Sequence, residues 1–125
     1  MCGILGFSGD NINKELFSDC LSRLSHRGPD GSGTWREDGI WLGHRRLSII
    51  DLSDNASQPM ELLGRYVITF NGEIYNYKEL RTELKKLNYQ FKSNSDTEIL
   101  LYSYIHWGTD FLNKLNGMWA MGIWD

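Results

Sequence analysis

The sequence predicts an α+β fold with a mainly antiparallel sheet. Strand-like segments stand near both ends of the chain, and two helical periodicities separate the middle strands from the last one. The 125 residues are 41% hydrophobic and 23% charged, a composition typical of a globular protein rather than a disordered chain or a coiled coil. Thirteen glycines indicate tight turns or close backbone contacts. We therefore expect one domain over residues 1–125.

A strand and a helix are expected first. Residues 3–9 are apolar and glycine-spaced, which is typical of a buried strand and places Cys2 at the edge of that strand. Apolar residues recur at helical spacing over 16–24. Gly28-Pro29 is expected to end this helix, because a left-handed glycine followed by proline cannot continue it.

Four further strands are expected, three in the middle of the chain and one at its end. Residues 33–36 and 40–44 predict a pair joined by a turn at Glu37-Asp38-Gly39. Residues 66–70 predict a strand that ends in an Asn71-Gly72 turn. The last strand is expected over 118–124, after an Asn116-Gly117 turn.

Two helices separate these strands. Asn76 with Glu79 predicts a capped helix whose apolar residues fall on one face. Ser95-Asp96-Thr97-Glu98 is the pattern of a capping box, and it opens a second helix that extends to Trp107 and ends at Gly108. A short helical turn is expected over 111–115.

Charge and hydropathy argue against nucleic-acid-binding and membrane-spanning proteins. The net charge is −3, and the two signs are mixed along the chain, so we expect no nucleic-acid partner. The longest apolar run, 118–124, is far shorter than the roughly 20 residues of a membrane-spanning helix, so we expect no membrane partner. No basic region precedes the apolar N-terminal segment, as a secretory signal requires. The expected compartment is the cytoplasm.

Cys2 is the first residue that suggests chemistry. Removal of the initiator Met1 would leave a cysteine that carries both a thiol nucleophile and an α-amine, whose ordinary pKa of about 7.7–8.0 suits a general base. The alternative is a small buried hydrophobic residue near a terminus. If Met1 is retained, the α-amine belongs to Met1 and the thiol lacks this base.

Asn71-Gly72 also has two interpretations. One is a hairpin turn, because both residues tolerate positive φ. The other is a pair of converging hydrogen-bond donors, the asparagine side-chain amide and the glycine N–H, which together stabilise a developing oxyanion.

Arg46 and Asp96 are candidates for binding charged groups. The planar guanidinium of Arg46 suits a carboxylate, although Asp51 is an equally good structural partner for it. Asp96 stands at a helix start, where its carboxylate is favoured by the helix dipole, so capping alone also accounts for it.

Five segments of the sequence are informative when they are taken together, although each is a weak signal alone. They are Met1-Cys2-Gly3-Ile4, His26-Arg27-Gly28-Pro29-Asp30, Arg46-Leu47-Ser48-Ile49-Ile50-Asp51, Asn71-Gly72-Glu73-Ile74-Tyr75-Asn76 and Ser95-Asp96-Thr97-Glu98. In order and spacing they resemble the class II glutamine amidotransferase domain, a member of the N-terminal-nucleophile hydrolases. The resemblance covers the whole chain, because residues 116–120 are similar to the next strand of the family.

Within the family, residues 46–51 and Gln58-Pro59 are similar to the asparagine synthetase branch. Domains like β-lactam synthetase and surface-polysaccharide amidotransferases share that branch. The resemblance implies a four-layer αββα sandwich. It also implies that residues 1–125 are a C-terminally truncated domain, because the family's domain continues through more strands.

The resemblance implies a mechanism for glutamine hydrolysis. Cys2 would attack the glutamine side-chain amide and form a γ-glutamyl thioester, while Asn71 and the Gly72 N–H hold the oxyanion. Arg46 would bind the α-carboxylate of glutamine, and Glu73 and Asp96 would bind its α-ammonium group. The pocket would be lined by the segment Leu47, Ser48, Ile49 and Ile50.

Cofactors and partners follow from the same resemblance. No cofactor is expected in this domain, because ATP and Mg belong to a synthetase domain whose pyrophosphate loop this sequence lacks. The expected partners are L-glutamine and a synthetase domain or chain that accepts ammonia. An unpaired last strand with Trp119, Met121, Ile123 and Trp124 also predicts a homodimer.

Two rival classes remain. One is a non-catalytic amidotransferase-like fragment that binds glutamine or a partner chain. The other is a redox or metal protein, for which the cysteines and histidines would have to supply ligands. Their spacings match no metal pattern. These residues are Cys2, Cys20, His26, His44 and His106.

Overall fold

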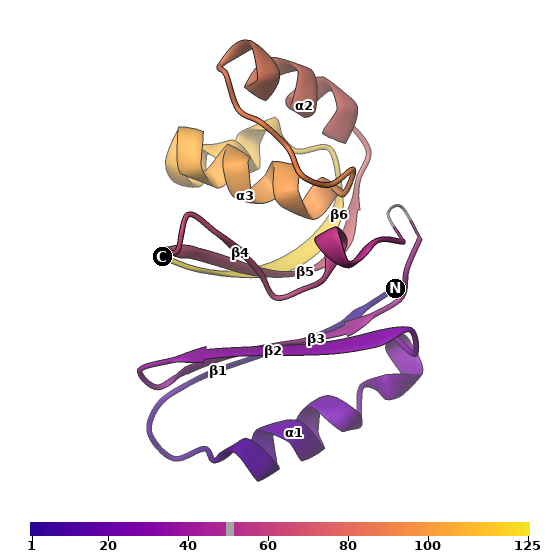
Figure 1. Ribbon diagram of the computed structural model, residues 1–125, viewed down its shortest axis with the longest axis vertical. Helices are drawn as coiled ribbons and strands as arrows, with labels where there is room; N and C mark the ends of the chain where they lie inside the picture. The colour runs from indigo at the N-terminus through magenta and orange to yellow at the C-terminus, as the bar shows by residue number, and fades with distance from the viewer. Residues whose placement is uncertain (50–51) are drawn as a thin grey trace.

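Two three-stranded antiparallel sheets face each other in the computed structural model, which describes residues 1–49 and 52–125 (Figure 1). The first sheet has the strand order β1 (Gly3–Ser8), β3 (Ile40–Arg46) and β2 (Gly31–Glu37). The second has the order β4 (Met60–Leu62), β5 (Tyr66–Ile74) and β6 (Gly117–Trp124).

Helices cover the outer faces of both sheets. Helix α1 (Lys14–Ser22) lies on the first sheet. Helix α3 (Asp96–Trp107) lies on the second, and α2 (Tyr77–Lys86) packs against α3 (Figure 1). The resulting four layers confirm the expected α+β class and the αββα arrangement implied by the resemblance. The expected strand over 3–9 is β1, which lies at one edge of its sheet and is only partly buried.

The β2–β3 hairpin has the predicted turn. Asp38 and Gly39 adopt φ values of 39° and 78°, the positive φ that makes Asp-Gly suitable for a tight hairpin. In the same sheet, Gly3 of β1 stands opposite Arg45 of β3. The start of β1 and the end of β3 therefore lie side by side at one end of the first sheet, and Cys2 directly precedes β1 there.

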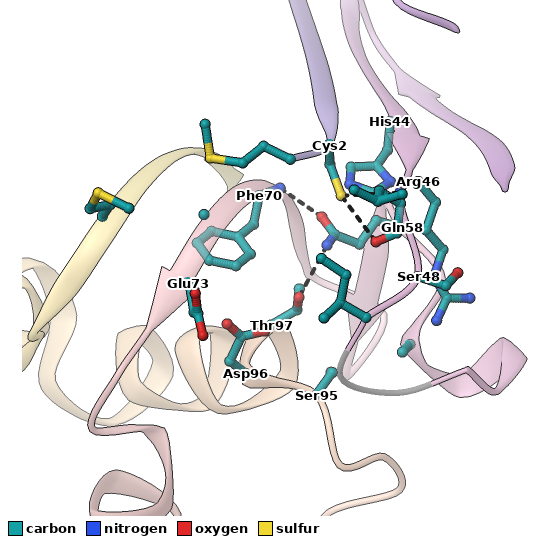
Figure 2. Close-up of a pocket in the computed structure, with 16 residues that line it drawn as sticks. Cys2, His44, Arg46, Ser48, Gln58, Phe70, Glu73, Ser95, Asp96 and Thr97 are labelled. Carbon is teal, nitrogen blue, oxygen red and sulfur yellow. Dashed lines mark hydrogen bonds between the residues drawn. The ribbon is translucent and has the colours of Figure 1, made fainter. Parts of the chain in front are cut away.

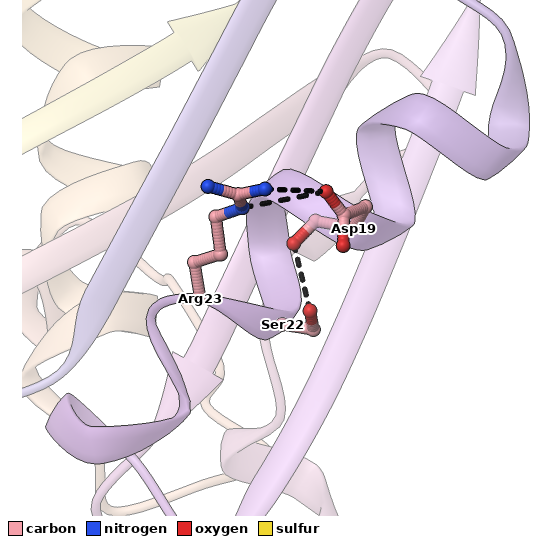
Figure 3. Close-up of polar contacts among 3 residues, drawn as sticks. All are labelled: Asp19, Ser22 and Arg23. Atoms are coloured by element: carbon pink, nitrogen blue, oxygen red, sulfur yellow. Dashed lines mark hydrogen bonds and ion pairs between the residues drawn. The ribbon is translucent and has the colours of Figure 1, made fainter.

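The end of α1 differs from the expectation. The α-helix stops at Ser22, where the Ser22 hydroxyl donates to the Asp19 carbonyl over 2.7 Å and Arg23 pairs with the Asp19 carboxylate over 3.2 Å (Figure 3). A 3-10 turn, Ser25–Arg27, follows. Gly28 has φ −148°, so the predicted left-handed stop is wrong. Glycine is required there because a Cβ would lie 2.2 Å from the carbonyl oxygen of Arg45.

Strand β5 is longer than predicted, and β4 was not predicted. Asn71 and Gly72 lie inside β5 and pair with Ala120 and Trp119 of β6, so they do not form a hairpin turn. The local turn preference of Asn-Gly gives way because the ladder between β5 and β6 is continuous from Val67 to Ile74. Strand β4 has only three residues, too few to show a period in the sequence.

The two helix starts differ in how their caps are made. Ser95 caps α3 by accepting from the Glu98 N–H over 3.3 Å, as predicted, and α3 ends at Gly108 with φ 59°. Asn76 precedes α2, but its side chain makes no cap. Its Nδ2 donates to the Lys114 carbonyl and its Oδ1 accepts from the Asn116 N–H, so it joins α2 to the loop before β6.

The main core lies between the second sheet and its helices. Alternate residues of β5 face this core, and the opposite face of β5 packs on the first sheet, where the Thr69 hydroxyl donates to the Gly43 carbonyl over 3.0 Å. The core side chains are Met60, Leu62, Ile68, Phe70, Ile74, Leu80, Leu84, Ile99, Leu100, Leu101 and Phe111. The short helix Gly108–Lys114 leads from α3 to β6, and β6 forms one edge of its sheet.

Candidate active site

A cavity of about 190 Å³ lies where the two sheets meet the start of α3 (Figure 2). Its walls come from the start of β1, the end of β3, the middle of β5 and the first turn of α3. It therefore contacts three of the four layers. Its lining residues are Met1, Cys2, His44, Arg46, Leu47, Ser48, Ile49, Ala56, Gln58, Phe70, Gly72, Glu73, Ser95, Asp96, Thr97 and Met118.

The thiol of Cys2 is held at this cavity by main-chain groups. The Leu47 N–H donates to Cys2 Sγ over 3.3 Å, and Sγ also contacts the Leu47 carbonyl at 3.7 Å. The carbonyl of Cys2 accepts from Arg27 Nε over 3.0 Å. Because Leu47 contacts the side chain of Cys2 and Arg27 contacts its main chain, the thiol points into the cavity in a fixed direction (Figure 2).

The segment after β3 is held in turn by Asp30. Its carboxylate accepts from the Ser48 N–H over 2.8 Å, and its own N–H donates to the Arg46 carbonyl over 2.9 Å. The motif at residues 26–30 therefore positions both Cys2, through Arg27, and the cavity wall, through Asp30. From the sequence, this motif was identified only by its resemblance to the family, and its contacts with Cys2 and Ser48 were not predicted.

Arg46 lines the cavity from the end of β3. One of its guanidinium nitrogens donates to the Ser53 carbonyl over 3.1 Å, which links the side chain to Ser53. Leu47, Ser48 and Ile49 line the cavity beside it, as the resemblance implies. The proposed pocket residue Ile50, and Asp51 as a structural partner of Arg46, lie outside the described residues.

Gly72 and Asn71 have different positions. Gly72 lines the cavity, and a Cβ at this residue would lie 2.2 Å from the Met118 carbonyl oxygen and 2.7 Å from Trp119 Cα. Only glycine fits so close to β6. Asn71 is half-buried but is not among the lining residues, and its Oδ1 accepts no hydrogen bond from the part of the chain that the structure describes.

Asp96 presents a buried carboxylate on the opposite wall. It is 6% exposed, and its Oδ2 accepts from the Ile74 N–H over 3.3 Å. Burial raises the pKa of Asp96, against the lowering effect of hydrogen bonds from the N–H groups of Ile74, Thr97 and Asp96 itself, and nearby Glu73 raises it further. The exposed Glu73 lies on the same wall (Figure 2). Because Glu73 and Asp96 repel each other, a cation bound near them would be favoured.

Gln58 and His44 line the cavity but were not predicted as site residues. Gln58 bridges Phe70 and Thr97 by hydrogen bonds, and the sequence marked it only as part of a branch pattern. His44 is 1% exposed, and its Nε2 has no hydrogen-bond partner among the described residues. Burial lowers the pKa of His44 to about 4. In the sequence, His44 was considered only as a possible metal ligand.

Met1 precedes Cys2 in the sequence, lines the same cavity and is 64% exposed. Within residues 1–49 and 52–125, no group of three or more His, Cys, Asp and Glu side chains is arranged to hold a metal ion. No helix in these ranges is long and apolar enough to cross a membrane.

The whole sequence matches a known family. The family model described as the glutamine amidotransferase domain covers residues 1–125. This chain belongs to the glutamine amidotransferase domain family. The amidotransferase domain thus has the identity that the five motifs indicated. Four of these motifs line the cavity, and the fifth, at residues 26–30, contacts the residues that do.

Curated relatives of the domain are asparagine synthetases. The chain is 41% identical to asparagine synthetase [glutamine-hydrolyzing] 3 of Bacillus subtilis (strain 168), with all of this chain and 21% of that protein aligned. It is 40% identical to asparagine synthetase B [glutamine-hydrolyzing] of Escherichia coli (strain K12), with all of this chain and 23% of that protein aligned. The chain spans about a fifth of the length of these relatives.

A solved structure supports the fold. The glutamine phosphoribosylpyrophosphate amidotransferase from B. subtilis, complexed with ADP and GMP, superposes with a TM-score of 0.83 at 20% sequence identity. The superposition covers 96% of this chain and 34% of that one. The amidotransferase domain therefore shares its αββα layers with a protein whose sequence is distant.

Proposed function

We propose that the domain hydrolyses glutamine to glutamate and ammonia, as the glutaminase part of an asparagine synthetase-like amidotransferase. One observation carries the proposal. The Cys2 thiol, Arg46, Gly72 and Asp96 come from four separate segments, and all of them line the same cavity. The relatives whose names describe glutamine-hydrolysing asparagine synthetases support the same substrate.

The charges of the cavity suit an amino acid. Free glutamine is a zwitterion, so its binding site needs a cation for the α-carboxylate and an anion for the α-ammonium group. Arg46 supplies the cation, and Asp96 with Glu73 supplies the anions. Leu47, Ser48 and Ile49, which line the cavity, would lie beside the α-carboxylate. Two of its donors already have partners, because Leu47 donates to Cys2 and Ser48 donates to Asp30.

The chemistry would begin at Cys2 once Met1 has been removed. The free α-amine of Cys2 takes the thiol proton, and the sulfur attacks the side-chain carbonyl carbon of glutamine. The Gly72 N–H and the Asn71 side-chain amide stabilise the resulting oxyanion. Gly72 has the stronger structural support, because it lines the cavity and Asn71 does not.

Two products leave in succession. The protonated amine gives its proton to the departing nitrogen, so ammonia leaves and a γ-glutamyl thioester remains on Cys2. The amine then takes a proton from water, and the hydroxide attacks the thioester. The C–S bond breaks, glutamate leaves, and the sulfur recovers its proton.

The ammonia would pass to a synthetase domain or chain, where ATP and Mg act; this domain itself would use no cofactor. We also propose a cytoplasmic location, because the N-terminal segment does not have the pattern of a secretory signal. The exposed Trp119 and Trp124 on the edge strand β6 support pairing with a second chain, including a homodimer.

The proposal is tested by a glutaminase assay combined with intact-mass measurement. Protein that has lost Met1 should release ammonia and glutamate from glutamine, and Cys2→Ala should lower the rate by at least roughly a thousandfold. Cys20→Ala, at the other half-buried cysteine, is the matched control and should keep the activity. Wild-type turnover in Cys2→Ala would disprove the mechanism. Glutamine binding without hydrolysis by the processed protein would instead indicate a non-catalytic binding module.

A further inference from the structure

The side chain of Gln58 forms a bridge inside the cavity wall. Its Oε1 accepts from the Phe70 N–H over 2.6 Å, and its Nε2 donates to the Thr97 hydroxyl over 3.0 Å (Figure 2). Phe70 belongs to β5, and Thr97 belongs to the first turn of α3. Gln58 therefore ties the second sheet to the helix layer through two hydrogen bonds.

The backbone of Gln58 contacts the first sheet. A Cβ at Gly33 of β2 would lie 2.0 Å from the Gln58 carbonyl oxygen, so the two main chains approach as closely as only a glycine permits. Gln58 thus contacts three layers at once: the first sheet by its backbone, and the second sheet and α3 by its side chain.

The same three layers supply the groups of the proposed reaction. Cys2 precedes β1 in the first sheet, Gly72 lies in β5, and Asp96 begins α3. Each end of the Gln58 bridge is close in sequence to one of these groups, because Phe70 is two residues before Gly72 and Thr97 directly follows Asp96. A second bridge, from the Ile74 N–H to Asp96 Oδ2, lies on the other side of Gly72.

We propose that Gln58 is a positioning residue that fixes the distance between the oxyanion donor at Gly72 and the ammonium acceptor at Asp96. This inference rests on the proposed glutaminase function. Arg46 and Asp96 would hold the α-carboxylate and α-ammonium groups of glutamine. The reacting side-chain carbonyl then reaches the Gly72 N–H only if the distance between β5 and α3 stays constant. The Gln58 and Ile74 bridges flank Gly72 and hold that spacing from both sides.

The chemistry of glutamine suits this position. Its side-chain amide carries an acceptor and a donor at one end, so it satisfies a main-chain N–H and a hydroxyl oxygen simultaneously. Leucine has a similar size but offers neither group, and it would leave the Phe70 N–H without its partner. The spacing would then depend on the Ile74 bridge alone.

The test measures steady-state hydrolysis of glutamine by the purified, processed protein, with kcat expressed per Cys2 site titrated by a thiol reagent. Gln58→Leu should lower kcat about tenfold and change KM by less than about threefold, because the ammonium and carboxylate contacts remain while the alignment at the reacting carbon is lost. Gln90→Leu, at the exposed second glutamine of the chain, is the matched control and should match wild type.

The partner residue provides a second, independent test, which also serves if Gln58→Leu fails to fold. Thr97→Val removes the hydroxyl with little change of shape and should lower kcat, and Thr97→Ser should recover most of that loss. The double variant Gln58→Leu with Thr97→Val should lose no more than Gln58→Leu alone, because both changes break one bridge.

Three outcomes would overturn the inference while leaving the proposed function intact: unchanged kcat per titrated site in Gln58→Leu, equal losses in Thr97→Val and Thr97→Ser, or fully additive losses in the double variant. If the wild-type protein hydrolyses no glutamine, the proposed function itself fails.

Discussion

The main-chain N–H of Leu47 donates a hydrogen bond to the sulfur of Cys2 over 3.3 Å. The two residues are 45 positions apart in the sequence and meet because β1 and β3 are neighbours in the first sheet. A main-chain donor is retained under any substitution of Leu47 except proline. The orientation of the thiol is therefore set by the backbone of the fold and not by a neighbouring side chain.

Glutamine should protect Cys2, and only Cys2, from alkylation. Both cysteines are half-buried and free, but Cys2 lines the cavity and Cys20 lies in α1 on the outer layer. A ligand at ten times its Kd should slow the reaction of Cys2 with iodoacetamide about tenfold. Peptide mass spectrometry measures both residues in one sample, so Cys20 is the internal control. Equal protection of both cysteines, or of neither, would contradict the placement of glutamine in this cavity.

Replacement of Arg46 should weaken glutamine binding more than it slows turnover. In Arg46→Leu, KM for glutamine should rise by at least about tenfold, because a charge-assisted contact to the α-carboxylate is lost equally from the bound substrate and the transition state. Steady-state kinetics give both constants, and a melting curve separates the loss of the Ser53 contact. Arg36→Leu, at an exposed arginine that does not line the cavity, is the control. A collapse of kcat at unchanged KM would rule out this role for Arg46.

Asp96→Asn should stabilise the fold and weaken substrate binding. The folded protein raises the pKa of Asp96 because the carboxylate is buried, so its stabilising contribution is complete below the unfolded pKa and is lost as pH rises through the folded pKa. At pH 7 the buried charge is unfavourable, and a neutral amide that still accepts from the Ile74 N–H removes that penalty.

Calorimetry and kinetics check the two halves of this prediction. At pH 7 the Tm of Asp96→Asn should exceed that of wild type, and KM for glutamine should rise at least about tenfold, because an uncharged group attracts the α-ammonium weakly. Asp110→Asn, at an exposed carboxyl outside the cavity, should change neither quantity. A lower Tm together with an unchanged KM would contradict both expectations.

His44 should make the fold sensitive to mild acid. Burial, aided by the charge of Arg46 and opposed by a hydrogen bond with the Phe70 backbone, lowers the pKa of His44 from 6.5 to about 4. Between these values the unfolded chain binds a proton that the folded protein does not, so stability falls as pH falls from 6.5 to 4. Above pH 6.5 this residue contributes no pH dependence.

Urea unfolding at two pH values measures the effect. Between pH 7.5 and 5, His44 should account for about 2 kcal/mol of lost unfolding free energy. In His44→Gln this part of the pH dependence should disappear, whereas His106→Gln, at an exposed histidine, should keep it. An identical pH dependence in wild type and His44→Gln would show that His44 does not carry the effect.

Local patterns in the sequence predicted most elements and several of the cavity residues. The Asp38-Gly39 turn and the Ser95 cap are determined by residues close in sequence, and both are confirmed. The predictions for Gly28 and for Asn71-Gly72 were wrong in local conformation. In both cases contacts with a distant strand, at Arg45 and at β6, decide the backbone.

The supporting residues of the site could not be predicted for the same reason. Asp30 and Gln58 act through hydrogen bonds to residues 18 and 39 positions away, and no short pattern encodes such a partner. The lowered pKa of His44 results from its burial, which the sequence does not show. Each of Cys2, Arg46 and Asp96 had a structural explanation of its own, so their roles were predicted from the resemblance of five segments to a known family. The fold brings all three to one cavity.

The crossing of layers at the cavity also has a consequence for how the protein folds. The contacts that define the site join residues 45, 39 and 22 positions apart, so no helix or hairpin contains a working fragment of it. Each of these contacts closes a loop of 22 residues or more, and the entropy lost in closing those loops is offset only when the layers pack together. A ligand bound in the cavity can therefore stabilise only the assembled layers.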